Sequence, residues 1–398
     1  MIAAIRNLPR TVWLLGLISL VNDTASDMIY PLVPLYLTSV LMAGPKALGL
    51  IEGIAEAVSS LLKLFAGVLA DRSRHVKIWV LGGYTIAGFA RPLLGLTTSW
   101  LGVLACRFAD RVGKGLRSAP RDAMLSLSVD PSQRGLAFGL HRAMDNLGAV
   151  IGPLVAAAML ALGVPMRHVF LWAIVPALVV VGLALWIKEP AREPAIKHIN
   201  FSWTLRDFPP QFRRYIVVLA LFTLGNSSNM FLLLRARDLG LPQTQVPILW
   251  ALVSLVAAVF STPLSALSDR LGRTRLIVIG WCVYAAFYLI LGLQHDNTWL
   301  LWPMFAGYGL FLAATEGAEK ALVADLVPHS IMGTAYGWYN LVVGLFLLPA
   351  SLLFGWLWQA FAPQVAFAFG AGCAVIAAVL LRFWVDPGKF APDAVQPR

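Results

Sequence analysis

Charged residues are scarce in this chain. They make up 13% of its 398 residues, whereas 59% are hydrophobic. Soluble domains carry about 25% charged residues, so this composition excludes a soluble globular fold. Cysteine is also rare, and an odd number of cysteines within apolar segments excludes a disulfide framework. The three cysteines are Cys106, Cys282 and Cys373.

The motifs of enzyme chemistry are missing as well. The sequence has no residues at metal-ligand spacing, no glycine-rich phosphate loop and no nucleophile motif. We therefore expect no enzyme activity, no catalytic residues, no bound metal and no cofactor. Any work that the chain performs must draw on an ion gradient, because nothing in the sequence would hydrolyse ATP.

Long apolar runs recur along the whole chain. Each is long enough to cross the hydrocarbon core of about 30 Å as a helix. The first run carries Asn22, Asp23 and Asp27 and is too long for a cleavable signal peptide. The sequence thus predicts an all-α membrane protein with twelve transmembrane helices. The predicted spans are 11–40, 47–70, 78–97, 100–126, 135–162, 168–187, 214–237, 246–268, 275–294, 298–327, 335–360 and 364–385.

The net charge of +11 is typical of membrane topology rather than nucleic-acid binding. Lys46, Arg167, Arg235 and Arg237 are the only basic residues expected on one side of the membrane. Basic residues concentrate in cytoplasmic loops, so the richer side is the cytoplasm and holds both termini. We expect a monomer in a bacterial inner membrane. The cytoplasmic set is Arg6, Arg10, Arg72, Arg74, Lys77, Arg134, Lys188, Arg192, Lys197, Arg206, Arg213, Arg214, Arg270, Arg273 and Arg275.

Two halves of the chain resemble each other. Residues 70–72 (ADR) match 268–270 (SDR), and 135–139 (GLAFG) match 333–337 (GTAYG) at the same offset. We therefore divide the chain into a first six-helix half, 1–187, a cytoplasmic linker, 188–213, and a second half, 214–398. Parallel repeats of this kind bind substrate near the membrane midplane and rock about it.

A stripe of ionisable residues follows the apolar start of the fourth span. At about 100° per residue its members fall within an arc of about 140°. Charges at the bilayer centre cost about 2.5–3.5 kcal/mol each on insertion scales, so the stripe must face a watery cavity or opposite charges. We call it the charge stripe: Arg107, Asp110, Arg111, Lys114, Arg117 and Arg121.

These features resemble the major facilitator superfamily. Residues 67–74 (GVLADRSR) are similar to its signature between helices 2 and 3, with Ser73 in place of the usual glycine, which the second copy restores at Gly272. Arg107 matches the helix-4 arginine. The resemblance implies two pseudo-symmetric six-helix bundles, the major facilitator fold, and transport by alternating access.

Helix 5 is similar to the antiporter signature of that superfamily. Gly139, Gly148, Gly152 and Pro153 keep its spacing, whereas Ala156 and Ala157 replace its terminal glycines. The glycines would let helix 5 approach another helix closely, and Pro153 would kink it. Generic small-residue packing is the alternative. The resemblance implies the proton-coupled exporter branch.

Gating follows from the same resemblance. It places Asp71 against the positive N-terminal end of helix 11 when the cytoplasmic side closes, with Arg72 as a surface anchor. Asp269 and Arg270 are the second-half counterparts. We also expect Arg121 with Asp122 to contact Glu319 with Lys320 as a latch between the halves. Pairing of each set within its own half is the alternative.

Proton coupling requires a carboxylate at membrane depth. Asp27 and Glu56 are the first candidates, followed by Asp23 and Glu52. Glu52 and Glu56 share one face of the second span and could pair with Arg107 or Arg111. Substrate contacts are expected from the stripe, where a guanidinium can grip two oxygens of an anion. The expected substrate-binding residues are Arg111, Arg117, Arg107, Asn22, Glu316, Trp338 and Tyr339.

The sequence therefore predicts a secondary active transporter of a small organic solute that is anionic or amphipathic. Its partners would be that solute, protons and the lipid bilayer, with no nucleic acid. Proton-coupled export is the main hypothesis. The alternatives are a proton-coupled symporter that imports an anionic metabolite and a membrane sensor that does not transport.

Overall fold

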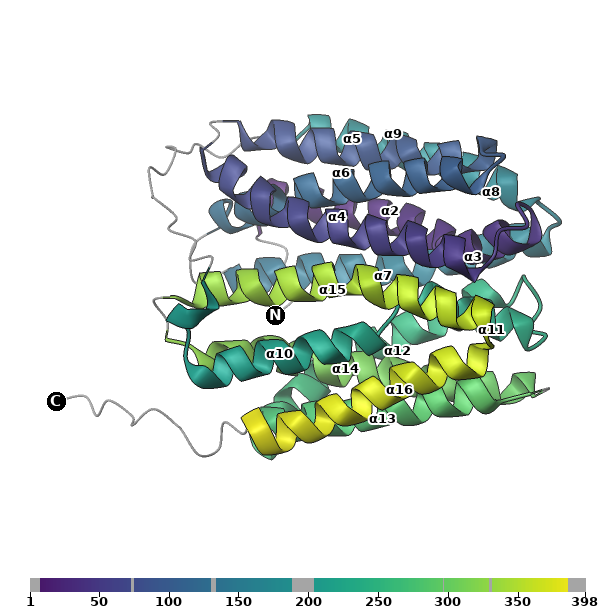
Figure 1. Ribbon diagram of the computed structural model, residues 1–398. Helices are drawn as coiled ribbons and strands as arrows, with labels where there is room; N and C mark the ends of the chain where they lie inside the picture. The colour runs from purple at the N-terminus through teal and green to yellow at the C-terminus, as the bar shows by residue number, and fades with distance from the viewer. Residues whose placement is uncertain are drawn as a thin grey trace.

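The computed structural model describes residues 8–72, 75–129, 134–187, 204–295, 297–328 and 331–385, and every regular element in these ranges is a helix (Figure 1). Each of the twelve predicted spans is occupied by one helix or by two consecutive helices. The elements are α2 (Arg10–Ile29), α3 (Leu32–Ser39), α4 (Pro45–Arg72), α5 (Val76–Leu93), η1 (Leu94–Leu96), α6 (Trp100–Leu127), α7 (Arg134–Ala161), α8 (Met166–Trp172), α9 (Ile174–Leu185), η3 (Leu205–Asp207), α10 (Pro210–Gly225), α11 (Met230–Asp238), α12 (Val246–Leu271), α13 (Arg273–Leu293), η4 (Thr298–Leu300), α14 (Leu301–Leu326), α15 (Met332–Ala360), α16 (Pro363–Leu380) and η6 (Leu381–Val385).

Within the described residues, seven helical segments are long and apolar enough to cross a membrane. Their mean hydropathy ranges from 1.2 for residues 10–39 to 2.4 for 166–185. α6 is not among them, because the charge stripe lowers the hydropathy of its second half. A helix of this composition needs protein or water, rather than lipid, around its charged face.

Three of the predicted spans are interrupted. Between α2 and α3 lies Pro31, which has no N–H to continue the helical hydrogen bonds. Residues 226–229 separate α10 from α11, and their Asn-Ser-Ser-Asn sequence favours turns over helix. The break between α8 and α9 is the single residue Ala173. Interrupted helices expose backbone groups at membrane depth, which a membrane protein tolerates only where protein or water satisfies them.

Helices from the two parts of the chain pack directly on each other. α4 lies along α15, and α7 lies along both α2 and α12 (Figure 1). Glycine permits the close contact of α4 with α15: a Cβ on Gly53 would lie 2.9 Å from a Leu348 side-chain carbon, and one on Gly355 would lie 2.6 Å from the backbone oxygen of Pro45. Small residues at such a seam let helix backbones approach.

The interior of the second half is aromatic. Phe222 stacks on Trp281 with ring centroids 4.3 Å apart, and Tyr284 stacks on Tyr288 at 4.1 Å. Tyr284 also donates a hydrogen bond to the backbone oxygen of Gly225, 3.0 Å away, at the end of α10. Most of the buried charged side chains lie instead in the first half, on and around α6.

Candidate functional site

The charge stripe lies on the buried face of α6. The side chains of Arg107, Asp110, Arg111 and Arg117 are at most 5% exposed. A helix brings residues three and four apart onto one face, so this spacing in the sequence is sufficient to align them. Their burial means that each must find an opposite charge, a hydrogen-bond partner or a visiting ligand.

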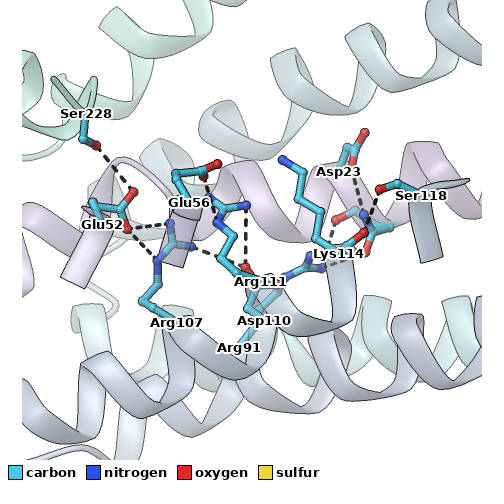
Figure 2. A network of polar contacts seen from close by, with 11 residues as sticks. Asp23, Glu52, Glu56, Arg91, Arg107, Asp110, Arg111, Lys114, Ser118 and Ser228 are labelled. Atoms are coloured by element: carbon cyan, nitrogen blue, oxygen red, sulfur yellow. Dashed lines mark hydrogen bonds and ion pairs between the residues drawn. The ribbon is translucent and has the colours of Figure 1, made fainter. Parts of the chain in front are cut away.

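The stripe pairs with acidic residues of α4 (Figure 2). Arg107 holds the Glu52 carboxylate through two nitrogens, at 2.7 and 2.9 Å, and Arg111 lies 3.0 Å from Glu56. The predicted pairing of the α4 carboxylates with these two arginines is confirmed. Ser228, from the second half of the chain, donates to the other oxygen of Glu52 at 3.4 Å. This hydrogen bond connects the two halves at the paired end of the stripe.

Arg91 of α5 completes this network and was not among the residues expected at the site. Its Nε lies 2.9 Å from Asp110, and its Nη1 lies 3.0 Å from the side-chain oxygen of Asn22. Asp110 also lies 3.5 Å from Arg107. The sequence did contain a sign of this role, because a charged arginine inside the apolar span 78–97 needs a buried partner. Asn22 therefore orients a buried guanidinium and does not line the cavity described below.

Arg117 is buried but has no carboxylate partner among the described residues. Its guanidinium lies over the ring of Tyr84, 4.6 Å from the centroid, in a cation–π contact. Its Nη1 has no hydrogen-bond partner in the described part of the chain. A buried nitrogen of this kind is costly to leave unsatisfied, and it lines a cavity.

A cavity of about 610 Å³ lies beside the stripe. Most of its lining side chains belong to α2, α4, α6 and α7 of the first half, while Trp250 and Lys320 come from α12 and α14 of the second. This volume is in the range of pockets for small organic molecules. The lining residues are Asp23, Ser26, Asp27, Tyr30, Glu56, Lys63, Arg111, Lys114, Arg117, Ser118, Arg121, Asp122, Arg142, Asp145, Trp250 and Lys320.

The predicted substrate residues divide into two groups. Arg111 and Arg117 line the cavity, and Glu316 lines a smaller adjoining cavity of about 210 Å³. Neither cavity is lined by Arg107, Trp338 or Tyr339, nor by Asn22. Of the proposed proton carriers, Asp23, Asp27 and Glu56 line the large cavity, whereas Glu52 lies behind it, 1% exposed.

The expected latch between the halves is not formed among the described residues. Arg121 pairs with its neighbour Asp122 at 2.9 Å, and Glu319 accepts hydrogen bonds from Tyr339 at 2.9 Å and Trp281 at 3.1 Å. The expectation was wrong for this conformation, because each set finds a nearer partner within its own half.

A different ion pair joins the halves. Arg142 of α7 lies 2.7 Å from Glu316 of α14, and Lys320 lies 3.2 Å from the same carboxylate oxygen. Arg142 and Glu316 are both more than half exposed, so solvent reaches this contact. This pair was not expected, because the two residues lie 174 positions apart and no local pattern links them.

The glycines of the predicted helix 5, which is α7 in the structure, differ in how closely other atoms approach them. A Cβ on Gly148 would lie 2.5 Å from the backbone oxygen of Leu20, and one on Gly152 would meet the backbone oxygen of Thr24. These two glycines therefore permit the close packing of α7 on α2. Gly139 has nothing within 4 Å of its Cβ position. Pro153 lies inside α7, as predicted.

The predicted gating residues lie at helix ends. Asp71 and Arg72 end α4, and Asp269 and Arg270 lie near the end of α12. Their side chains fall outside the described part of the chain, and so does the linker from 188 to 203. The gating role of these four residues stays a prediction.

Comparisons with known proteins agree with this architecture. The model of the Major Facilitator Superfamily matches residues 15–232 and 215–397. An uncharacterized MFS-type transporter of Methanocaldococcus jannaschii is 36% identical over 385 residues, covering 95% of this chain and 96% of that protein. The multidrug resistance protein MdtH of Yersinia enterocolitica is 24% identical and covers 80% and 79%. The crystal structure of a mutant of the nucleoside transporter NupG superposes with a TM-score of 0.82 at 12% identity, covering 94% and 99%, a likeness of fold.

Proposed function

The chain belongs to the major facilitator superfamily of membrane transporters, and we propose that it exports a small organic solute in exchange for protons. The observation that carries this proposal is the cavity of about 610 Å³, which is lined by charged side chains and bounded by helices of both halves. A site between two repeats can open to either side as they rock, which is the basis of alternating access.

The proposed topology has twelve spans in two six-helix bundles, 1–187 and 214–398, joined by a cytoplasmic linker, 188–213. Both termini would lie in the cytoplasm of a bacterial cell, with the protein in the inner membrane. The asymmetry of Lys and Arg between alternate loops supports this orientation.

Asp27 is the proposed proton carrier, with Asp23 beside it. Both line the cavity, one helical turn apart, and neither forms an ion pair with a described Lys or Arg. Glu52 and Glu56 are weaker candidates than the sequence suggested, because Arg107 and Arg111 hold them as charged partners. A carboxylate that must bind and release a proton cannot be neutralised permanently by a guanidinium.

Export is the favoured direction. The spacing of the helix-5 glycines supports it, as does the similarity to a protein named for multidrug resistance. The substrate is proposed to carry an anionic group, since Lys63, Lys114 and Arg117 line the cavity without carboxylate partners among the described residues. Cations that line a cavity without such partners favour a visiting anion.

Flux in proteoliposomes tests the proposal. A stability screen on the purified protein supplies a ligand, and its flux is then measured with an imposed pH gradient of either sign. Asp27→Asn should abolish gradient-driven flux but keep ligand exchange, which moves no net proton. Asp238→Asn, at an exposed position at the end of α11, is the matched control and should behave as wild type. Full gradient-driven flux in Asp27→Asn would contradict the coupling assignment.

The same assay separates the alternatives. Accumulation of the ligand on the side that the protons enter would identify a symporter that imports an anionic metabolite, whereas accumulation on the side that they leave is expected of an exchanger. Binding without exchange or flux under any gradient would identify a sensor. The pairing of Arg111 with Glu56 in the cavity wall is compatible with each of them.

A further inference from the structure

The cavity beside the charge stripe has an acidic wall. Asp23 and Asp27 of α2 lie one turn apart, and Asp145 of α7 faces the same space. Asp145 lies 3.4 Å from His141, between Oδ2 and Nδ1, and Asp23 accepts a hydrogen bond from Asn22 at 2.7 Å. None of the three forms an ion pair with a Lys or Arg in the described ranges.

A second group of lining side chains, which we call the basic wall, is cationic. Lys63 of α4 and Lys114 and Arg117 of α6 line it, and no described carboxylate lies within ion-pair distance of them. Lys320 of α14 adds a fourth cation, which shares the single carboxylate of Glu316 with Arg142. Lys114 and Asp23 both line this cavity, and Figure 2 draws no contact between them.

An aromatic pair also lines the cavity. Tyr30 directly follows α2, and Trp250 lies near the start of α12. Their ring centroids are 5.2 Å apart. Both rings line the cavity. They provide an apolar surface in the cavity, of the kind that an aromatic or aliphatic body of a ligand contacts.

We propose that the substrate is a zwitterion, with an ammonium held by Asp23 and Asp27 and a carboxylate or phosphate held by Lys63, Lys114 and Arg117. Its apolar body lies against Tyr30 and Trp250. This inference rests on the proposed function and names the substrate class of the same site. A molecule with one charge would satisfy only one of the two groups and would leave the other group's partly buried charges without a ligand partner, which is less favourable.

The polarised cavity also gives a route to proton coupling. A carboxylate can hold a proton or an ammonium, but not both at once. Arrival of the substrate's ammonium at Asp27 would therefore displace the proton, and departure of the substrate would let the proton return. No group on the basic wall needs to change its charge in this exchange.

Matched sets of ligands test the proposal. Each set keeps one skeleton and changes only its charges: phenylalanine, 3-phenylpropanoate and 2-phenylethylamine; tryptophan, indole-3-propanoate and tryptamine; phosphoethanolamine, ethyl phosphate and ethanolamine. Binding to the purified full-length protein is measured by calorimetry and by thermal stabilisation. In at least one set we expect the zwitterion to bind about tenfold more tightly than either partner, since each loses one charge-assisted contact.

Two variants test which wall binds which charge of the ligand. Asp27→Asn should remove the preference for the zwitterion over the anion and keep the preference for the zwitterion over the cation. Lys114→Gln should remove the preference for the zwitterion over the cation and keep the preference over the anion. The matched controls are Asp238→Asn and Lys46→Gln, at exposed positions outside the cavity, and both should keep the wild-type order.

The inference is overturned if no zwitterion outranks both of its partners in any set, including the case in which nothing binds. It is also overturned if the two cavity variants change the order no more than their controls. Failure of this inference can be told apart from failure of the proposed function. If an anion ranks first and is transported in exchange for protons, the zwitterion proposal is refuted and the exporter proposal stands. If a zwitterion ranks first but shows no flux, the substrate class stands and the exporter proposal is refuted.

Discussion

At the scale of single residues, the α4–α6 ion pairs account for the burial of so many charges. The effective penalty for burying an ion is several kcal/mol, and only close, hydrogen-bonded partners offset it. Glu52 meets this condition, since it receives two nitrogens of Arg107 and the hydroxyl of Ser228. Removing one member of such a pair should therefore lower the free energy of unfolding much more than replacing both members.

Glu52→Gln should destabilise the folded protein by about 3 kcal/mol, because Arg107 then keeps only Asp110, at 3.5 Å. The double variant Glu52→Gln with Arg107→Met should recover much of that loss. Thermal unfolding in detergent measures both. The control is Glu316→Gln in the exposed pair with Arg142, where the change should stay below about 1 kcal/mol. Equal losses of stability in Glu52→Gln and Glu316→Gln would show that the buried pair contributes no more to stability than the exposed pair.

At the scale of elements, the packing of α7 on α2 depends on two glycines. Gly148 and Gly152 bring α7 against the backbone of α2 at Leu20 and Thr24, next to the segment that carries Asp23 and Asp27. The helix-5 signature thus has a structural consequence at the cavity, because the spacing of these two helices sets the position of the acidic wall.

Gly148→Val should destabilise the protein by about 1–3 kcal/mol, the usual range for overpacking, since its Cβ would lie 2.5 Å from the oxygen of Leu20. It should also weaken ligand binding by moving α2. Gly139→Val makes the same chemical change on the same helix, where nothing lies within 4 Å, and should alter neither property. Melting temperature and Kd, measured for both variants, check this. A tolerated Gly148→Val would mean that α7 does not rely on this contact.

At the scale of the whole molecule, the two halves meet along two seams and enclose the cavity between them. α4 on α15 forms one seam, and α7 on α12 forms the other. The Tyr30–Trp250 pair and the Arg237–Thr38 hydrogen bond, at 2.7 Å, connect the halves on the side of the cavity away from the ends of α4 and α12. The gate proposed around Asp71 and Asp269 would act at the opposite end.

The orientation of the molecule is testable by labelling. In a variant without Cys106, Cys282 and Cys373, we expect Arg192→Cys to react with a membrane-impermeant maleimide only after cells are opened. Lys46→Cys, exposed at the start of α4, should react in intact cells. The reason is the excess of basic residues on the side of Arg192. The reverse pattern would invert the proposed topology.

The sequence by itself determined the helical class, the helix positions and the existence of a charged face on α6. These properties depend on hydropathy and on helical periodicity, which are local. It also predicted that Glu52 and Glu56 meet Arg107 and Arg111, because the acidic face of the second span and the cationic face of the fourth span lie at similar positions along their helices. The role of each residue in transport remains a prediction.

Only the tertiary structure decided which partners the remaining charges choose. Arg91 reaches Asp110 across the contact of α5 with α6, and Arg142 reaches Glu316 across the two halves. Glu319, expected in a latch, bonds to Trp281 and Tyr339 instead. Such choices depend on the lateral packing and rotation of helices, which no local pattern encodes, and ion pairing is decided within distances of about 4 Å, where small shifts change the partner.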